Sequence, residues 1–499
     1  MTPRTFGMLG MLGLVAALGA AYVTGPIPGV LQSSLVNSDV IALYVDPLTG
    51  NDGNACISAA APCLTCNGAI SKLPKLIGKR AVVTLAAGTY STAGSGCAVD
   101  QISMLPFSDS TSTADAQLIF QGTLENVTPA TGSATGTLSS FAASSSTAFA
   151  VATDSAATWT VNDFQGKLFV TTGGTGSGKT YAIISNTATA ITLAGTITTM
   201  SATTTYAIQD SGTNMSGFAV SGSGPNSVAQ AIFMVGGGTP AAKQSGNGSD
   251  GQSTGDLQIK WIKFSGSSTS ITSSGALQVS VFANHFAGNQ NCVVQLGNAR
   301  MSVVANSYTS TGTFSGMYAA SSDASVGAQV TATGNVQIAG GTMFNFKTGT
   351  ALLTRNYGNG MTGSGMILSR GANVNSTQDR FTGILGATNP CLSLAAGTGL
   401  SRPSSSYLSA TNVDCASGAS DAVYVDGSSQ ALLSTVTGTG NTGYGVRAEY
   451  GGRVEITSTT TVTGTTNDIL IDGTAYTYVV LRALIPKTIF TNGTLVYER

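Results

Sequence analysis

A short motif that recurs along the second half of the chain constrains the fold more than any other feature. Each copy is a β-rich run that ends in Asn or Asp, with an aromatic residue one or two positions later. The copies are Asn284 with Phe286, Asn306 with Tyr308, Asn356 with Tyr357, and Asp379 with Phe381. The polar positions are 22, 50 and 23 residues apart, which predicts one rung per about 22–25 residues and two rungs in the gap of 50. Such repeats stack with equivalent positions aligned, so we expect ladders of asparagine and of aromatic side chains from Leu257 to about Val480.

The composition excludes several classes of protein. Charged residues make up 9% of the 499, with 21 Lys and Arg against 22 Asp and Glu, so no basic patch for nucleic acid is expected. Only four residues are Glu, whereas exposed helix faces are usually rich in Glu and Lys. The mean hydropathy is positive, at +0.22, and a disordered chain would be more polar. An all-β fold with a neutral surface rich in hydroxyl groups remains.

Residues 41–90 carry a more specific pattern. The stretch IALYVDPLTGNDGN predicts a strand and a turn, APCLTCNGAI predicts a short amphipathic helix, and a second strand ends in GTY. This order resembles the N-terminal start of right-handed parallel β-helix proteins of the pectate-lyase-like type. The resemblance implies an all-β, right-handed parallel β-helix solenoid with a short capping helix from Cys66 to Leu73. It implies no activity, because lyases, adhesins and phage spikes share this fold.

The pattern of residues between 141 and 210 differs from that of the rungs. Here TWTVNDFQGKLFVTT, a glycine-rich turn and IISNTATAITL resemble a small antiparallel β module that is inserted in phage virion proteins. We therefore divide the chain into an apolar N-terminal segment at 1–38, the first β-helix rungs at 39–140, the inserted module at 141–210, the main solenoid at 211–480 and a β-rich tail at 481–499.

Within that module, the stretch GGTGSGKT matches the phosphate-binding loop pattern G-x-x-x-x-G-K-[ST], with Gly173, Gly178, Lys179 and Thr180 at the fixed positions. Such a loop binds phosphate because a helix begins at the Lys-Thr pair and directs its N–H groups at the ligand. The next residues, YAIISNTATAITLAG, instead predict two strands separated by a turn. We therefore interpret the match as a glycine-rich hairpin turn and expect no cofactor.

Seven cysteines are present, and four of them lie in the first hundred residues. Cys63 and Cys66 have the C-x-x-C spacing, but zinc would need a second pair nearby and a redox site would need a βαβ frame. We therefore expect no metal site. Two alternatives stay open, which are a local disulfide such as Cys56 to Cys63 in an exported protein, and buried thiols.

The residues needed by polysaccharide-cleaving enzymes do not form a recognisable pattern. The chain has no Asp-Asp pair, and its only histidine, His285, lies inside a rung motif. The nearest approach to the aspartate cluster of a lyase is Asp414, Asp421 and Asp426, with Arg402 and Arg447 on either side.

A hydrolase with carboxylates about one water molecule apart is the other enzyme to consider. Asp379, Asp414 and Glu449 are the residues that such a site would use, but nothing in their spacing selects them. We interpret the acidic residues as turn positions at rung corners. No catalytic residue is assigned, and the sequence favours a protein that is not an enzyme.

The N-terminal segment, MTPRTFGMLGMLGLVAALGAAYVTG, holds an apolar run from Phe6 to Val23. Three alternatives stay open for it. It is a secretory signal cleaved after Ala20 or Ala21, an uncleaved anchor, or an apolar peptide that docks into a partner protein.

Taken together, the solenoid pattern and the inserted module resemble phage tailspikes, tail fibres and virion fibres. The resemblance implies a structural or receptor-binding virion protein. It implies binding to a host-surface glycan or protein and contact with other virion proteins through the N-terminal segment. We also expect a homotrimer, because the apolar residues of the C-terminal segment need partners that copies around a threefold axis would supply. These residues are Val479, Val480, Leu481, Ile485, Ile489 and Phe490. No nucleic-acid partner is expected. The alternatives are an exported bacterial adhesin, secreted or at the cell surface, and a polysaccharide-degrading enzyme.

The hairpin interpretation predicts that Lys179→Ala changes the free energy of unfolding by no more than about 0.5 kcal/mol, as is usual for an exposed turn residue. Differential scanning fluorimetry is expected to show the same melting temperature with and without millimolar ATP or GTP. Saturable nucleotide binding that Lys179→Ala abolishes would instead show a working phosphate-binding loop.

Overall fold

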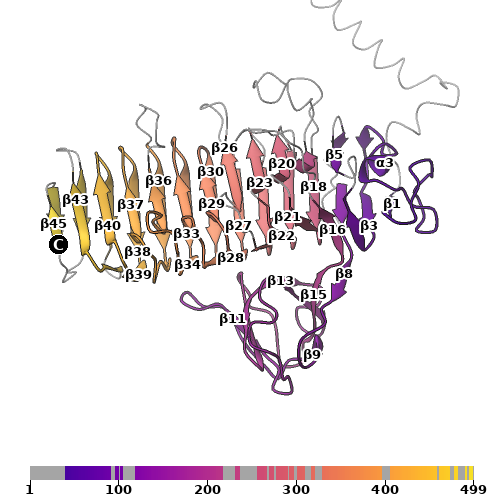
Figure 1. Cartoon of the computed structure of the whole chain (residues 1–499), viewed down its shortest axis with the longest axis horizontal. Coiled ribbons are helices and arrows are strands. Elements are labelled where there is room, and N and C mark those ends of the chain that lie inside the picture. Colours follow the sequence, from indigo (N-terminus) through magenta and orange to yellow (C-terminus); the bar gives the residue numbers. More distant parts are fainter. Residues whose placement is uncertain are drawn as a thin grey trace, which may run out of the picture.

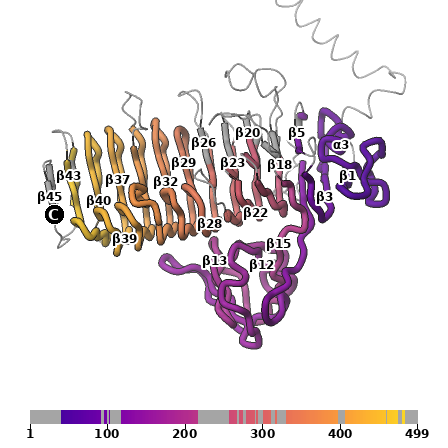
Figure 2. The backbone as a smooth tube through the Cα atoms, viewed as in Figure 1, coloured from indigo at the N-terminus to yellow at the C-terminus, as the bar shows by residue number. Residues whose placement is uncertain are grey.

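The computed structural model is a long stack of short strands with a smaller β lobe beside it (Figure 1). Within the described residues, the stack contains three parallel sheets of 14, 12 and 8 strands. The chain winds around the stack, so that neighbours within a sheet come from successive rungs (Figure 2). The predicted parallel β-helix is confirmed. The structure describes residues 40–91, 96–99, 102–104, 118–216, 231–235, 255–266, 269–274, 277–289, 291–296, 300–309, 316–320, 329–395, 405–457, 460–472, 477–481, 489–491 and 494–497.

Each parallel sheet is built from strands that follow one another along the chain. The 14-stranded sheet contains β1 (Ile41–Val45), β3 (Ala81–Leu85), β7 (Leu118–Gln121), β18 (Gly255–Lys260), β21 (Leu277–Phe282), β24 (Arg300–Val304), β27 (Gln329–Thr333), β30 (Thr350–Thr354), β33 (Asn373–Thr377), β36 (Tyr407–Thr411), β38 (Gln430–Ser434), β41 (Arg453–Ile456), β44 (Tyr478–Leu481) and β46 (Thr494–Tyr497). The 12-stranded sheet contains β5 (Cys97–Val99), β17 (Ala231–Val235), β20 (Thr269–Ser274), β23 (Asn291–Leu296), β26 (Met317–Ala320), β29 (Phe344–Phe346), β32 (Met366–Leu368), β35 (Leu392–Leu394), β37 (Val423–Val425), β40 (Tyr444–Glu449), β43 (Asn467–Asp472) and β45 (Ile489–Thr491). The 8-stranded parallel sheet contains β4 (Gly88–Tyr90), β16 (Thr213–Ser216), β19 (Lys263–Ser265), β22 (His285–Ala287), β25 (Ser307–Thr309), β28 (Val336–Ala339), β31 (Tyr357–Asn359) and β34 (Arg380–Thr382). Two further parallel pairs are β2 (Leu76–Ile77) with β6 (Ser103–Met104), and β39 (Thr437–Asn441) with β42 (Thr461–Gly464).

Period-two patterning explains why these segments form strands. In β27, Val330 and Ala332 are buried while the residues between and around them are more exposed. In β30, Ala351 and Leu353 are buried in the same alternating pattern, and they lie in register with Val330 and Ala332. Because side chains alternate along a strand, each of these strands contributes two apolar residues to the interior. The stacked rungs form one continuous core from Leu43 to Leu481.

A ladder of buried amide side chains runs along one corner of the stack. We call it the asparagine ladder, and it consists of Asn284, Asn306, Asn335, Asn356 and, at its end, Asp379. The Oδ1 atom of each residue from Asn306 onward accepts the backbone N–H of the residue one rung earlier, at 2.7–3.0 Å. Each asparagine Nδ2 also donates to a main-chain carbonyl oxygen, at 2.8–3.0 Å. Asn335 fills the gap of 50 residues, which therefore holds two rungs as predicted.

An aromatic column lies beside the asparagine ladder. The rings of Phe264, Phe286 and Tyr308 are stacked, with centres 5.2 and 5.1 Å apart. The register continues through Gln337 and Gly358 to Phe381, so Phe286, Tyr308 and Phe381 share one position but not on successive rungs. The two smaller or polar residues interrupt the stack. The Phe381 ring instead packs edge-on against Phe344, at 6.3 Å. The prediction was wrong for Tyr357, which lies one residue earlier in the register, opposite Val336 and Arg380.

The smaller lobe is an antiparallel sheet with its own apolar core, which includes Trp159, Phe169 and Tyr206. Its strands are β8 (Leu124–Asn126), β9 (Thr135–Thr137), β10 (Ser140–Ala142), β11 (Ala150–Thr153), β12 (Leu168–Gly173), β13 (Thr180–Asn186), β14 (Ala190–Leu193) and β15 (Thr205–Ser211). Two of these strands, β8 and β9, lie before residue 141, in the range that the sequence assigned to the first rungs. We call the lobe, residues 124–211, the module.

The glycine-rich stretch connects β12 to β13 as a hairpin. Gly174, Gly176 and Gly178 have φ values of 74°, 83° and 78°, a region that glycine adopts without steric penalty. The backbone N–H of Lys179 donates to Oγ1 of Thr171 at 2.9 Å, and the Lys179 side chain is exposed. A strand, and not a helix, follows the Lys-Thr pair.

The module packs on the solenoid through an apolar contact made of Phe149, Ala182, Ile184, Ala194 and Val336. Beside this contact the two backbones approach closely. A Cβ atom on Gly334 would come within 2.9 Å of the Cα of Gly195, so a larger residue there would push the module away.

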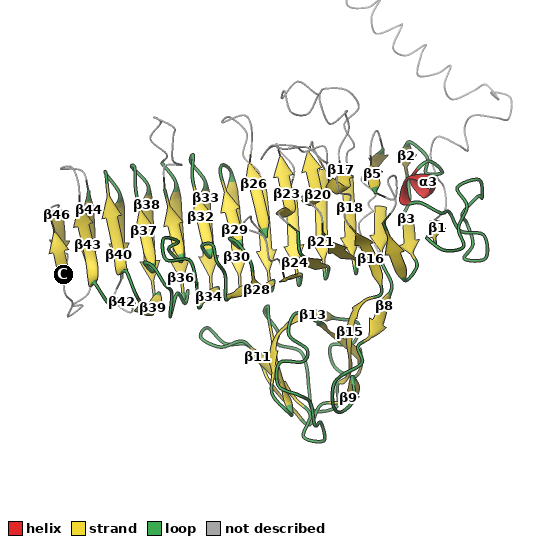
Figure 3. Cartoon of the chain, in the orientation of Figure 1, coloured by secondary structure: helices red, strands yellow, loops and turns green. Residues whose placement is uncertain are grey.

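A short helix, α3 (Cys66–Ile70), lies near the N-terminal end of the described chain (Figure 3). It ends three residues before Leu73, where the sequence predicted its end. Thr65 begins the helix, because its Oγ1 accepts the backbone N–H of Gly68 at 2.9 Å. The helix contacts β1 and β5. Its role as the cap of the first rung stays a prediction.

Three disulfides link Cys56 to Cys63, Cys66 to Cys97 and Cys391 to Cys415, and Cys292 is a buried thiol. Of the two alternatives that the sequence left open, the local disulfide from Cys56 to Cys63 is therefore present. Cys63 and Cys66 belong to different disulfides, so the C-x-x-C pair is not a redox pair. The loops closed by these links span 7, 31 and 24 residues, and covalent links of this kind stabilise a fold by about 2–4 kcal/mol each.

Asp379 gives the asparagine ladder a pH dependence that can be measured. Burial raises the pKa of its carboxyl to about 6, although hydrogen bonds from Ser376 and Asn356 oppose this shift. The folded protein therefore holds the proton more tightly than the unfolded chain, and stability falls as the pH rises from about 4 to about 6. Asp379→Asn keeps an acceptor for Asn356 and removes the buried charge. Relative to the wild type, we expect the variant to gain about 2 kcal/mol between pH 4 and pH 7 in urea unfolding.

The matched control is Asp163→Asn, which changes an aspartate of the module outside the ladder. Parallel pH profiles for the wild type and Asp379→Asn would show that this carboxyl does not titrate differently in the folded protein.

Candidate functional site

Charged and aromatic side chains gather on the outer surface of the 12-stranded sheet, on β37 and β40. Val423 and Val425 are buried, so the alternation of side chains places Tyr424 on the outside. Tyr424 is paired in register with Arg447 of β40, one rung further along the chain. Rung stacking thus places an aromatic ring beside a guanidinium.

Arg447 is held by several partners at once. Its Nε and Nη2 atoms donate to Oε1 of Glu449, at 2.9 and 2.8 Å, and its Nη1 lies 3.8 Å from Oδ2 of Asp421. The guanidinium carbon lies 5.3 Å from the ring centre of Tyr424 and 5.9 Å from that of Tyr444, within the range of a cation–π contact. The side chain is 38% exposed, so the held guanidinium still faces solvent.

The carboxyl groups around Arg447 have shifted acidities. Burial is the main cause that raises the pKa of Asp421, while the backbone N–H of Tyr444, which it accepts at 2.7 Å, opposes the shift. Burial also raises the pKa of Asp426, and the nearby charge of Glu449 adds to it. The Tyr424 hydroxyl lies 3.4 Å from Oδ2 of Asp426 and 3.3 Å from Oε2 of Glu449. Burial and these carboxylates raise the pKa of Tyr424 above its usual range, so its hydroxyl remains a hydrogen-bond donor.

We call this cluster the Arg447 site, and it consists of Asp421, Tyr424, Asp426, Tyr444, Arg447 and Glu449. Four of its members, Asp421, Tyr424, Tyr444 and Arg447, line a surface pocket of about 630 Å³. The other walls come from turns at 387–390 and 419–420. A volume of this size suits a small-molecule ligand or a segment of a polymer.

The structure brings together some of the charged residues that the sequence singled out and separates others. Asp421, Asp426, Glu449 and Arg447 meet in one cluster, and the two aspartates flank β37. The aromatic partners Tyr424 and Tyr444 were not anticipated. The sequence did contain a clue to Tyr424, because its strand precedes the strand of Arg447 by one rung length and the two residues pair in register.

Asp379 and Asp414 lie elsewhere, so the trio with Glu449 does not form a hydrolase site. Asp379 ends the buried asparagine ladder, and Asp414 pairs with Arg380 at 3.1 Å near the 8-stranded sheet. Arg402, the remaining candidate, lies outside the described residues.

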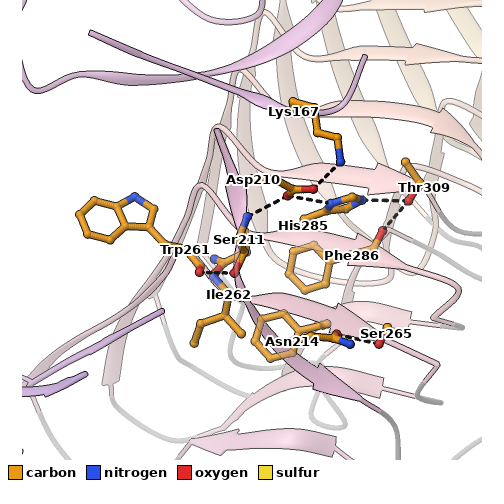
Figure 4. A network of polar contacts seen from close by, with 12 residues as sticks. Lys167, Asp210, Ser211, Asn214, Trp261, Ile262, Ser265, His285, Phe286 and Thr309 are labelled. Atoms are coloured by element: carbon orange, nitrogen blue, oxygen red, sulfur yellow. Dashed lines mark hydrogen bonds and ion pairs between the residues drawn. The ribbon is translucent and has the colours of Figure 1, made fainter. Parts of the chain in front are cut away.

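A second polar network joins the module to the solenoid (Figure 4). His285 of β22 directs Nδ1 to Oδ1 of Asp210, at 3.2 Å, and Nε2 to Oγ1 of Thr309, at 3.1 Å. The other carboxylate oxygen of Asp210 accepts a hydrogen bond from the ammonium group of Lys167. Burial works to raise the pKa of Asp210, but the contacts with His285 and Lys167 outweigh it and hold that pKa far below its usual range.

The order carboxylate, imidazole and hydroxyl also occurs in acyl-transfer enzymes. Here the Thr309 hydroxyl donates to the carbonyl oxygen of Phe286 at 3.3 Å, so its proton is directed at a main-chain acceptor. Asp210 belongs to the last strand of the module, β15, and His285 belongs to the solenoid, so we interpret the network as a structural link between module and solenoid.

The described part of the chain holds no group of three or more His, Cys, Asp or Glu side chains placed to bind a metal ion. In the same residues, no helix is long and apolar enough to cross a membrane.

No protein-family model and no curated protein matches the sequence. Among solved structures, the chain is similar to the tailspike of Pseudomonas phage phi297, at 10% identity, with 84% of this chain and 68% of that chain covered and a TM-score of 0.29. It is similar to XylC in complex with xylose, at 10% identity, with coverage of 82% and 75% and a TM-score of 0.29. It is also similar to the lacto-N-biosidase from Eubacterium ramulus, at 8% identity, with coverage of 92% and 67% and a TM-score of 0.29. Identities and scores this low support no inference about activity.

Proposed function

We propose that this chain is a receptor-binding virion protein of the tailspike, tail-fibre or head-fibre type, and that it attaches to host-surface glycans through the Arg447 site. One observation carries the proposal. Two tyrosine rings, Tyr424 and Tyr444, flank a solvent-facing guanidinium and several carboxylates in a pocket on the outside of the solenoid.

This combination of side chains matches the chemistry of a sugar. A sugar ring has an apolar face, which packs against an aromatic ring, and a rim of hydroxyl groups, which hydrogen-bond strongly to charged side chains. In the Arg447 site, the single guanidinium of Arg447 stands among the carboxyl groups of Asp421, Asp426 and Glu449. The site therefore favours neutral or amino sugars over acidic ones.

Placement on a virion is supported by the resemblance of the module to inserts of phage virion proteins and by the rod-like solenoid. The N-terminal segment at 1–38, which lies outside the described residues, would then dock into another virion protein. An exported adhesin on a bacterial surface is the alternative. Mass spectrometry of virions purified from the same source distinguishes the two, because only a virion protein is found in the particles.

Cleavage of a bound polysaccharide is a second candidate function, favoured by the raised pKa of Asp421 and Asp426. A raised pKa makes a carboxyl better suited to act as a general acid in glycoside hydrolysis. Oligosaccharide release that Asp421→Asn and Asp426→Asn each abolish would establish this activity in place of simple attachment.

Binding of labelled protein to an array of bacterial surface polysaccharides tests the attachment proposal. Tyr424→Ala removes the central ring of the Arg447 site, and we expect it to lower affinity for the bound polysaccharide roughly tenfold or more. Tyr407→Ala is the matched control, because Tyr407 is an exposed tyrosine on the 14-stranded sheet. Its affinity should equal that of the wild type.

Two outcomes count against the proposal. One is a wild-type protein that binds no polysaccharide on the array, and the other is an equal loss of binding in both variants.

Assembly into a homotrimer is a further part of the proposal. Within the described chain, β45 and β46 lie at the ends of their sheets, and pairing of such edges between copies would support a trimer. Val479 and Leu481 are already buried within the solenoid and need no second copy. Light scattering on the full chain is expected to give three times the chain mass of 49.9 kDa. A monomeric mass, unchanged when residues 477–499 are deleted, would exclude the trimer.

A further inference from the structure

An exposed tyrosine lies at a corner of the solenoid, directly beside the Arg447 site. Tyr450 follows Glu449, a member of that site, and begins the turn that joins β40 to β41. The residue is 68% exposed. Within the described chain, no hydrogen bond or ring contact holds its side chain. This tyrosine therefore contributes little to the packing of the solenoid.

The backbone of Tyr450 has a conformation that disfavours a large side chain. Its φ is 47°, in the left-handed region that glycine adopts without steric penalty and that is unusual for a bulky residue. The register of β37 with β40 and of β38 with β41 places Tyr450 opposite Gly427 on the preceding rung, where φ is 58°. Because glycine occupies this turn position one rung earlier, the fold itself does not require a tyrosine here.

The surrounding structure holds the turn in this conformation. The N–H of Gly451 donates to Oγ1 of the buried Thr477 at 2.7 Å, and the N–H of Gly452 donates to the carbonyl oxygen of Glu449 at 2.8 Å. A Cβ atom on Gly452 would come within 2.4 Å of the carbonyl oxygen of Val425, so the turn packs tightly on the preceding rung. Residues that are held in unfavourable backbone conformations in this way are typical of ligand-binding sites.

Tyr450 also continues the Arg447 site along β40. Val446 and Ala448 are buried, so Arg447 and Glu449 lie on the outer face of the strand. Tyr450 comes three residues after Arg447, which is roughly 10 Å in an extended chain. A polysaccharide that leaves the pocket along β40 therefore reaches the tyrosine ring within a few sugars. Gly427, opposite the ring on the preceding rung, has no side chain that could cover it.

We propose that Tyr450 is an outer sugar-binding position of the Arg447 site. Its ring packs against a neutral sugar of a polysaccharide whose neighbouring sugars occupy the pocket. The choice of a glycan rests on the proposed function, whereas the choice of this position rests on the exposure and the backbone of Tyr450. An uncharged aromatic ring matches the apolar face of a sugar that carries no charge. The Arg447 site then recognises a run of sugars and not a single one.

Surface plasmon resonance tests the proposal, with the array polysaccharide that the wild type binds most tightly as the probe. Tyr450→Gly removes the ring and suits the backbone, and we expect it to lower the affinity about fivefold or more. Tyr450→Phe keeps the ring and should retain most of the affinity. In urea unfolding, the midpoint of Tyr450→Gly should be no lower than that of the wild type, because glycine is favoured at this φ.

The matched control is Arg370→Gly. Arg370 is exposed, has a φ of 54° and occupies the same turn position three rungs earlier. Its removal should leave the affinity for the polysaccharide unchanged.

Hydroxyl-radical footprinting of the wild type, read by mass spectrometry, gives a second measurement that a purely structural role of Tyr450 would not affect. We expect the polysaccharide to protect Tyr450 from oxidation, while the exposed Tyr407 on the 14-stranded sheet stays unprotected.

Unchanged affinity in Tyr450→Gly, an equal loss in Arg370→Gly, or a large loss in Tyr450→Phe would overturn the proposal. Oxidation of Tyr450 that is the same with and without the polysaccharide would also overturn it. A wild type that binds no polysaccharide contradicts the proposed function and this inference together. Loss of binding in Tyr424→Ala but not in Tyr450→Gly contradicts this inference alone, so the two failures can be told apart.

Discussion

The buried asparagine ladder is the interaction on which the rest of the structure depends. At this corner of the solenoid, backbone N–H groups face the interior and cannot reach water. Each amide from Asn306 to Asn356 accepts one such N–H and donates to a carbonyl, which satisfies polar groups that would otherwise be costly to bury. These bonds form only when rungs are aligned in register, so the ladder also sets which surface residues become neighbours.

The ladder ends at Asp379, and the chain beyond it is held differently. The same corner position contains the buried apolar residues Val413 and Val436 on the following rungs. The disulfide from Cys391 to Cys415 links the chain in this region, where a long insertion separates one rung from the next. At this corner, covalent linkage and apolar packing thus replace amide bonding in the part of the solenoid beyond Asp379, which carries the Arg447 site.

The sequence predicted the parts of the fold that repeat. The spacing of Asn284, Asn306 and Asn356 was enough to predict the rung length and an unseen rung between the last two, which Asn335 supplies. The Arg447 site was harder to predict from the sequence. Its carboxylates and Arg447 could be named as candidates, but Tyr424 becomes significant only when register places it beside Arg447. Nothing in the sequence indicated that Arg355 is buried, since its guanidinium donates to a loop of the module about 210 residues earlier in the chain.

If the asparagine ladder holds the rungs from Asn284 to Asp379 in register, the solenoid is rigid along that corner. Hydrogen–deuterium exchange with mass spectrometry tests this most directly. The backbone N–H groups of Asn284, Asn306, Asn335 and Asn356 are each bonded to the next side chain of the ladder. They should exchange only by global unfolding, while the glycine hairpin at 174–178 exchanges within seconds to minutes. Ladder amides that exchange as fast as that hairpin would contradict this role of the ladder.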